Sequence, residues 1–229
     1  MVEIEPSVAR WSHEPGDRAG RPLLVLLHGV GSHEGDLAGL APYLPQDYAL
    51  VSLRAPLPHG DGFSWYPLDV PGRPDVVGVD EAAAAVLRFV DGLGDDHPTV
   101  GLVGFSQGGS LALQLVRHAP RRFSLAVVLA GFLAGDEHQG DAAVAAVRPA
   151  VFYGRGDVDT VIPADAVERT ERWLADHADA EVAVYPGLAH GISAEELDAV
   201  NAFLARTTAV AAADSDDAAD VDDEDEVGA

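Results

Sequence analysis

Short apolar runs alternate with amphipathic segments along most of the chain. Residues 22–28 (Pro-Leu-Leu-Val-Leu-Leu-His) form the first apolar run, which is typical of a parallel strand buried on both faces. The same pattern predicts further strands over 48–54, 99–105, 125–132, 149–153 and 181–185. Amphipathic segments predict helices over 36–44, 75–93, 110–118, 163–177 and 193–205.

Strands that alternate with helices predict an α/β fold with a mostly parallel, doubly wound sheet flanked by helices on both sides. Residues 2–12 are expected to add an antiparallel edge strand. Ser193-Ala-Glu-Glu196 has the spacing of a capping box, which predicts that the last helix begins there.

A Gly-x-Ser-x-Gly pattern, Gly104-Phe-Ser-Gln-Gly108, lies between one predicted strand and the following helix. The five residues alone are weak evidence in a chain with 24 glycines and 10 serines. After a strand and before a helix, however, the tight turn exposes the Ser106 hydroxyl at the carboxyl end of the sheet. Gly104 and Gly108 are expected because a side chain at either position would collide with the neighbouring strand or helix.

Two further strands place an acid and a histidine downstream of this serine. Asp157 and Asp159 follow the strand over 149–153, and His190 follows the strand over 181–185. The order Ser, Asp, His is that of the α/β-hydrolases. A serine hydroxyl becomes a good nucleophile only when a neutral imidazole takes its proton, and a carboxylate fixes the imidazole tautomer.

Only two of the nine histidines, His28 and His190, directly follow a predicted apolar strand. His28 precedes the serine, and there we expect its imidazole to hydrogen-bond the backbone and shape the turn. His190 is therefore the predicted general base.

Several segments within residues 20–206 resemble the carboxylesterase/phospholipase-like branch of the α/β-hydrolases, which includes the acyl-protein thioesterases. They are Leu27-His-Gly-Val-Gly31, Arg54-Ala-Pro-Leu-Pro58 with Ser64-Trp-Tyr66, Gly104-Phe-Ser-Gln-Gly-Gly109, Asp159-Thr-Val-Ile-Pro163 and Gly187-Leu-Ala-His190.

The resemblance implies a serine hydrolase that cleaves carboxylic esters or thioesters through an acyl-enzyme. Ser106 is then the nucleophile, His190 the base and Asp159 the acid that orients it. The acid loop is two residues longer than is usual in the family and lacks its histidine, so Asp157 remains the alternative acid.

Two backbone N–H groups are expected to hold the oxyanion: that of Gln107, at a helix amino terminus, and that of Val30, which the resemblance places there. Trp65 is predicted to line an acyl pocket or to act as a lid.

Acidic residues outnumber basic ones strongly. There are 38 acids and 14 bases, all of them arginine, and the formal net charge is −24. In molar salt the Debye length falls to about 3 Å, which screens the self-repulsion that such a charge causes. The composition therefore predicts adaptation to a very salty cytoplasm, and the lack of a basic face argues against a nucleic-acid partner.

Residues 207–229 contain alanine, aspartate and glutamate without any base and are predicted to form an acidic disordered tail behind a hydrolase domain over 1–206. The chain has no cysteine, no apolar run long enough for a membrane span and no basic amino-terminal leader. We therefore expect a cytoplasmic protein that needs no metal or cofactor for the reaction. The resemblance adds a homodimer as an expectation.

Two other functions fit the same pattern. One is a different reaction on the same fold, such as a dienelactone-hydrolase-like or perhydrolase activity, although the first group uses the cysteine that this chain lacks. The other is a non-catalytic binding protein of this architecture.

Overall fold

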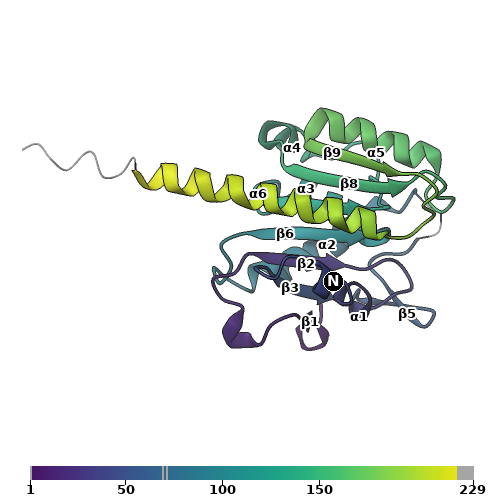
Figure 1. Cartoon of the computed structure of the whole chain (residues 1–229). Helices are drawn as coiled ribbons and strands as arrows, with labels where there is room; N and C mark the ends of the chain where they lie inside the picture. The colour runs from purple at the N-terminus through teal and green to yellow at the C-terminus, as the bar shows by residue number, and fades with distance from the viewer. Residues whose placement is uncertain (1, 69, 71, 221–229) are drawn as a thin grey trace, which may run out of the picture.

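A seven-stranded sheet forms the centre of the protein in the order β1-β3-β2-β6-β7-β8-β9 (Figure 1). The structure is a computed structural model that describes residues 2–68, 70 and 72–220, with side chains as far as Thr208. All neighbouring strands are parallel except β1 and β3. The strands are β1 (Arg10–Trp11), β2 (Leu23–Leu27), β3 (Ala49–Leu53), β6 (Val100–Phe105), β7 (Leu125–Leu129), β8 (Ala150–Gly156) and β9 (Asp179–Tyr185).

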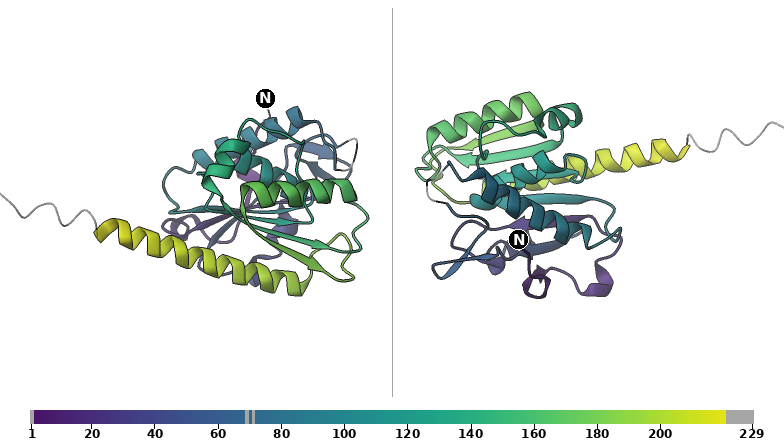
Figure 2. Two further views of the ribbon diagram at one scale, coloured as in Figure 1. Left: turned by 90° about the horizontal axis from the view of Figure 1, so that it is seen from above. Right: turned by 180° about the vertical axis from the view of Figure 1, so that it is seen from behind.

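Helices cover both faces of this sheet, as Figure 2 shows. They are α1 (Glu34–Ala38), α2 (Val76–Asp91), α3 (Gln107–His118), α4 (Asp141–Val147), α5 (Ala164–His177) and α6 (Ala194–Asp220). Helices α2, α3, α4 and α5 contribute to one core, and α1 and α6 contribute to the other. The predicted doubly wound α/β sheet is therefore confirmed.

The central strands are buried along their whole length. Every residue of β2, β3 and β7 is buried, which explains why these strands appear in the sequence as continuous apolar runs. The predicted antiparallel edge strand is also present, although β1 is only two residues long.

Two local predictions were wrong, and two features of the fold were not predicted. The helix expected over 36–44 begins earlier, because the His33 side chain accepts from the Gly35 N–H, and it ends at Ala38, before a 3₁₀ turn over Ala41–Tyr43. The strand expected over 125–132 ends at Leu129, because Ala130 has a φ of 47°. The hairpin of β4 (Leu57–His59) and β5 (Gly62–Ser64), like α4, was not predicted.

Helix α6 extends from Ala194 to Asp220, well beyond the predicted end at residue 205, and its last turns project from the sheet (Figure 1). Part of the segment expected to be a disordered tail is therefore helical, in keeping with the high helix propensity of alanine. Residues 221–229 lie outside the described residues, so the domain boundary at 206 stays a prediction.

Parallel strands all end at the same edge of the sheet, which brings together the loops after β2, β6, β8 and β9. These four loops carry the residues that the sequence predicts for chemistry. In the part of the chain that the structure describes, no helix has both the length and the hydropathy to cross a bilayer.

Candidate active site

Ser106 occupies a strained turn between β6 and α3. Its φ is 54° and its ψ is −113°, a conformation that is costly for a residue with a side chain. A Cβ at Gly104 would lie 2.2 Å from the Gly108 carbonyl oxygen, and one at Gly108 would lie 1.9 Å from the Leu27 carbonyl oxygen. Both glycines are thus required, as predicted, for the strand, the turn and α3 to pack closely.

The imidazole of His190 lies between Ser106 and Asp159. Its Nε2 is 2.9 Å from Ser106 Oγ, and its Nδ1 is 2.7 Å from Asp159 Oδ2. An ionised Asp159 makes Nδ1 the protonated nitrogen, so Nε2 is free to accept the serine proton. The Phe105 ring packs against the imidazole, with 5.0 Å between ring centroids, and limits its movement.

The structure brings Asp159, rather than Asp157, to His190. Asp159 Oδ1 accepts from the N–H groups of Val161 and Ile162, so the second carboxylate oxygen is free to point at the imidazole. Asp157 instead accepts from the Gly187 N–H at 2.6 Å and fixes the turn before the histidine loop. The two acids therefore have different positions and different partners.

The loop after β2 lies beside Ser106. A Cβ at Gly29 would be 3.5 Å from the Ser106 Cβ. Phe63 of the β4–β5 hairpin holds this loop through two backbone hydrogen bonds of 2.8 Å. The Phe63 carbonyl accepts from the Gly31 N–H, and the Phe63 N–H donates to Ser32 O. Among the described residues, neither the Val30 N–H nor the Gln107 N–H has an intramolecular backbone acceptor.

Trp65 does not occupy the predicted position at an acyl pocket or a lid. Its side chain is only 1% exposed, and its indole N–H donates to His28 O at 2.8 Å. His28 is buried as well and accepts from the Ala55 N–H through Nε2. Burial lowers the pKa of His28 and favours the neutral ring. Through these hydrogen bonds, His28 and Trp65 support the loop after β2 from the interior of the protein.

The side chain of Gln107 has a role that the sequence did not predict. It is fully buried, and its Oε1 accepts from the Trp65 N–H at 2.9 Å while its Nε2 donates to Tyr66 O at 2.8 Å. The residue after the nucleophile is therefore tied to the 64–66 segment by its side chain. A glutamine between Ser106 and Gly108 gives no sequence signal for such a contact.

An ion pair was also missed. Arg54, after β3, donates to both carboxylate oxygens of Glu34 at 2.6 and 2.7 Å. The hydrogen bonds from Arg54 lower the pKa of Glu34 to about 2. This pair connects the end of β3 to the beginning of α1, directly after the loop that contains Val30.

Glu196, in the first turn of α6, lies six residues after His190 and is 0% exposed. The predicted capping box is only half formed: Ser193 Oγ accepts from the Glu196 N–H, but the Glu196 carboxyl turns into the protein. Both of its oxygens are without a hydrogen-bond partner among the described residues, and burial raises its pKa to about 7. Gly154 of β8 makes room for it, because a Cβ there would lie 2.2 Å from Glu196 Oε1.

A cavity of about 260 Å³ opens next to the acid loop. Its lining includes Ala130, Gly131, Asp159, Ile162 and Val167, but neither Ser106 nor His190. The cavity therefore adjoins the triad at Asp159 and does not lie directly over the serine.

Comparison with known proteins agrees with this geometry. The sequence profile of the phospholipase/carboxylesterase family matches residues 98–208, which contain Ser106, Asp159 and His190. The chain shares its fold with the α/β-hydrolases and is similar to the phospholipase/carboxylesterase family over somewhat less than half of its length. The protein superposes on the crystal structure of esterase PE8 with a TM-score of 0.74 and 27% identity, covering 90% of this chain and all of the other.

The chain has fungal proteins among its curated relatives. It is 28% identical to a probable esterase of Aspergillus terreus over 64% of its own length and 66% of the relative's. It is 26% identical to acyl-protein thioesterase 1 of Eremothecium gossypii over 79% of its own length and 85% of the relative's. The alignment thus spans slightly less than two thirds of the Aspergillus protein.

Proposed function

We propose that this protein hydrolyses carboxylic esters or thioesters through an acyl-enzyme formed on Ser106. The observation that carries the proposal is the chain of contacts from Ser106 Oγ to His190 and on to Asp159, at 2.9 and 2.7 Å. A nucleophile, a base and an acid that orients the base are the minimum set for this chemistry. The names of the fungal relatives, esterase and acyl-protein thioesterase, are in keeping with both substrate classes.

In the first step Ser106 Oγ attacks the substrate carbonyl carbon while its proton passes to His190 Nε2. The carboxylate of Asp159 stabilises the imidazolium that forms. Collapse of the tetrahedral intermediate breaks the bond to the leaving group, which takes the proton from His190. Water then attacks the acyl-enzyme with His190 again as base and releases the acid and free Ser106.

The oxyanion of each tetrahedral intermediate needs donors that are already in place. The N–H groups of Gln107 and Val30 are our proposal for this role. Within the part of the chain that the structure describes, neither group has a backbone acceptor, and the loop that contains Val30 is held next to Ser106 by the hairpin. Gln107 begins α3, so the positive end of the helix dipole adds to the stabilisation.

The geometry argues against a non-catalytic binding protein. A binder would have no need for the unfavourable φ of Ser106, which stores strain in this turn. Nor would it need an imidazole held between the hydroxyl and a carboxylate.

Hydrolysis of p-nitrophenyl acetate and butyrate by Ser106→Ala tests the proposal. We expect the variant to lose activity to the background rate while its circular dichroism spectrum is unchanged. Ser124→Ala is the matched control, since Ser124 lies at the opposite edge of the sheet, just before β7, and should keep full activity. Turnover by Ser106→Ala at the unmodified rate would refute the proposal.

A further inference from the structure

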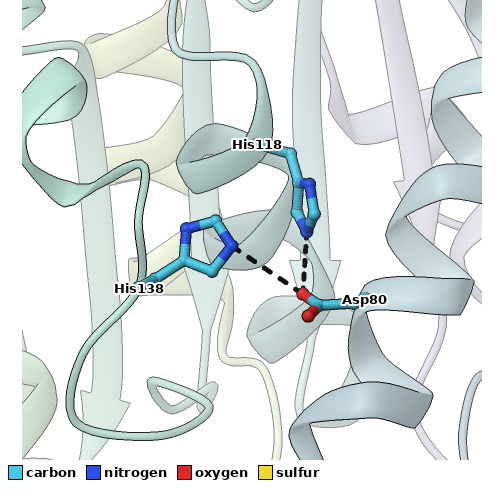
Figure 3. A group of neighbouring side chains, drawn as sticks. All are labelled: Asp80, His118 and His138. Carbon is cyan, nitrogen blue, oxygen red and sulfur yellow. Dashed lines mark hydrogen bonds and ion pairs between the residues drawn. The ribbon is translucent and has the colours of Figure 1, made fainter.

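Away from the triad, three potential metal ligands converge on one point from three different elements. They are Asp80 of α2, His118 at the end of α3 and His138 in the loop before α4. Figure 3 shows that both imidazoles direct Nε2 at the carboxylate of Asp80. Ser106 lies at the other end of α3, roughly 18 Å away for a helix of this length.

The separations among these atoms suit a small ion. His118 Nε2 is 2.7 Å and His138 Nε2 is 3.9 Å from Asp80 Oδ1, and the three ligand atoms all lie within 4.8 Å of one another. Ligands about 2.0–2.1 Å from a tetrahedral zinc ion lie roughly 3.3 Å apart. The contact from His138 is too long for a hydrogen bond, so its Nε2 is directed at Asp80 without bonding it.

We propose that Asp80, His118 and His138 bind one divalent transition-metal ion of the zinc class, with water completing the coordination. Two imidazoles and one carboxylate favour zinc, cobalt or nickel over magnesium or calcium, which prefer oxygen ligands alone. The ion would connect α2, α3 and the loop before α4, and would have no part in the hydrolysis.

The surroundings of the cluster allow such an ion to enter and stay. The side chains of Asp80 and His118 are 37% and 23% exposed, whereas that of His138 is 8% exposed. A metal ion binds the neutral form of an imidazole. The charge of Arg117 is balanced by its own ion pair with Asp141.

Three contacts compete with the ion and limit its affinity, and the first is the hydrogen bond of 2.7 Å between His118 Nε2 and Asp80 Oδ1. Gln114 Nε2 donates to Asp80 Oδ1 at 2.6 Å, and the Gly140 N–H donates to His138 Nδ1 at 3.0 Å. Without metal, therefore, the ring proton of His138 is on Nε2. Metal on Nε2 requires this proton to move to Nδ1, so the contact with Gly140 must open. We consequently expect weaker binding than in a closed structural zinc site.

Titration of the metal-free full-length protein with Zn²⁺ and with Co²⁺ tests the site. Buffer with 1 M KCl suppresses loose binding to the many surface carboxylates. We expect binding to saturate at one ion per chain. The visible absorption bands of bound Co²⁺ should be those of an ion with four or five ligands, nitrogen among them. A Co²⁺ spectrum that stays that of the free aqueous ion would overturn the proposal.

Three single variants, Asp80→Asn, His118→Gln and His138→Gln, locate the bound ion. Each is expected to weaken Zn²⁺ binding at least about tenfold. His177→Gln is the matched control, because His177 is a partly buried histidine at the end of α5, hydrogen-bonded to Trp173 O, and its replacement should leave binding unchanged. Equal affinity in the unmodified protein and in all three variants would also overturn the proposal, even if one ion binds.

Discussion

The carboxylate of Asp159 lies 2.7 Å from His190 Nδ1, although the two residues are 31 positions apart in the chain. The histidine arrives from the loop after β9 and the acid from the loop after β8, so the neighbouring positions of these strands in the sheet create the contact. Asp157, two residues earlier, bonds the Gly187 backbone instead. This difference separates the two acids experimentally.

Asp159→Asn should lower kcat about 10⁴-fold, because an amide can stabilise neither the required imidazole tautomer nor the imidazolium. Asp157→Asn is its matched control and should retain most of the activity, since an amide oxygen can still accept from the Gly187 N–H. Steady-state kinetics on p-nitrophenyl butyrate measures both. A larger loss in Asp157→Asn than in Asp159→Asn would reverse the proposed assignment.

Gln107→Ala should reduce both stability and rate. The change leaves the Trp65 N–H unpaired in a buried place, at a cost of about 1–3 kcal/mol in the free energy of unfolding, while the Tyr66 carbonyl keeps its hydrogen bond from the Ser64 hydroxyl. Loss of this support should also shift the backbone after Ser106 and lower kcat about tenfold or more.

Gln114→Ala provides the comparison for Gln107→Ala. Gln114 is a buried glutamine of the same helix, but it bonds Asp80 and lies well away from Ser106. We expect urea unfolding to detect a loss of stability in both variants and kinetics to detect a loss of kcat in Gln107→Ala only. An equal kcat in the two variants would contradict the role of Gln107 at the site.

Glu196 should make the protein less stable as the pH rises. Its pKa is about 7 in the folded protein against 4.5 for an ordinary glutamate, so between these values the folded state holds a proton that the unfolded state has lost. The stabilisation that this proton gives to the folded state is complete below about pH 4.5 and is lost as the pH rises to about 7. The free energy of unfolding falls by at most about 3 kcal/mol over this range.

Urea unfolding at pH 5 and pH 8 measures this effect. Glu196→Gln should lose less stability than the unmodified protein over this interval, while Glu195→Gln, a change at an exposed neighbour, should behave like the unmodified protein. If Glu196→Gln and the unmodified protein showed the same pH dependence, ionisation of the buried Glu196 carboxyl would not be the cause of the lost stability.

The net charge of −24 predicts a strong response to salt. The free energy of unfolding and kcat/KM should both rise as KCl increases from 0.1 M, with most of the gain by about 1 M, where the Debye length is already about 3 Å. Urea titrations and p-nitrophenyl ester kinetics across a KCl series measure the two quantities. Equal stability and rate at 0.1 M and 3 M KCl would contradict the prediction of a halophilic protein.

Much of the site was predictable because local patterns determine it. The Gly104–Gly108 turn follows from steric demands within a few residues, and Asp159 and His190 follow because each lies in the loop after a strand that the sequence predicts. The hairpin turn at His59-Gly-Asp-Gly62 had a recognisable Gly-Asp signal that was missed.

Other features depend on contacts that no local pattern encodes. The Glu34–Arg54 pair joins residues 20 positions apart, and the Gln107 side chain reaches a segment more than 40 residues earlier. Trp65 was misplaced because its position in a loop above the sheet does not determine whether the indole faces the solvent or the core. Its N–H finds a buried acceptor at His28 O, which favours the core.

The most direct test of the central claim is the intact mass of the protein after treatment with a fluorophosphonate probe, followed by peptide mapping. We predict one adduct per chain on Ser106 Oγ, no adduct in Ser106→Ala and much slower labelling in His190→Ala, because the imidazole activates the hydroxyl. Two results would contradict the claim that Ser106 is an activated nucleophile. One is that the folded, unmodified protein gives no adduct, and the other is that Ser106→Ala is labelled at the same rate.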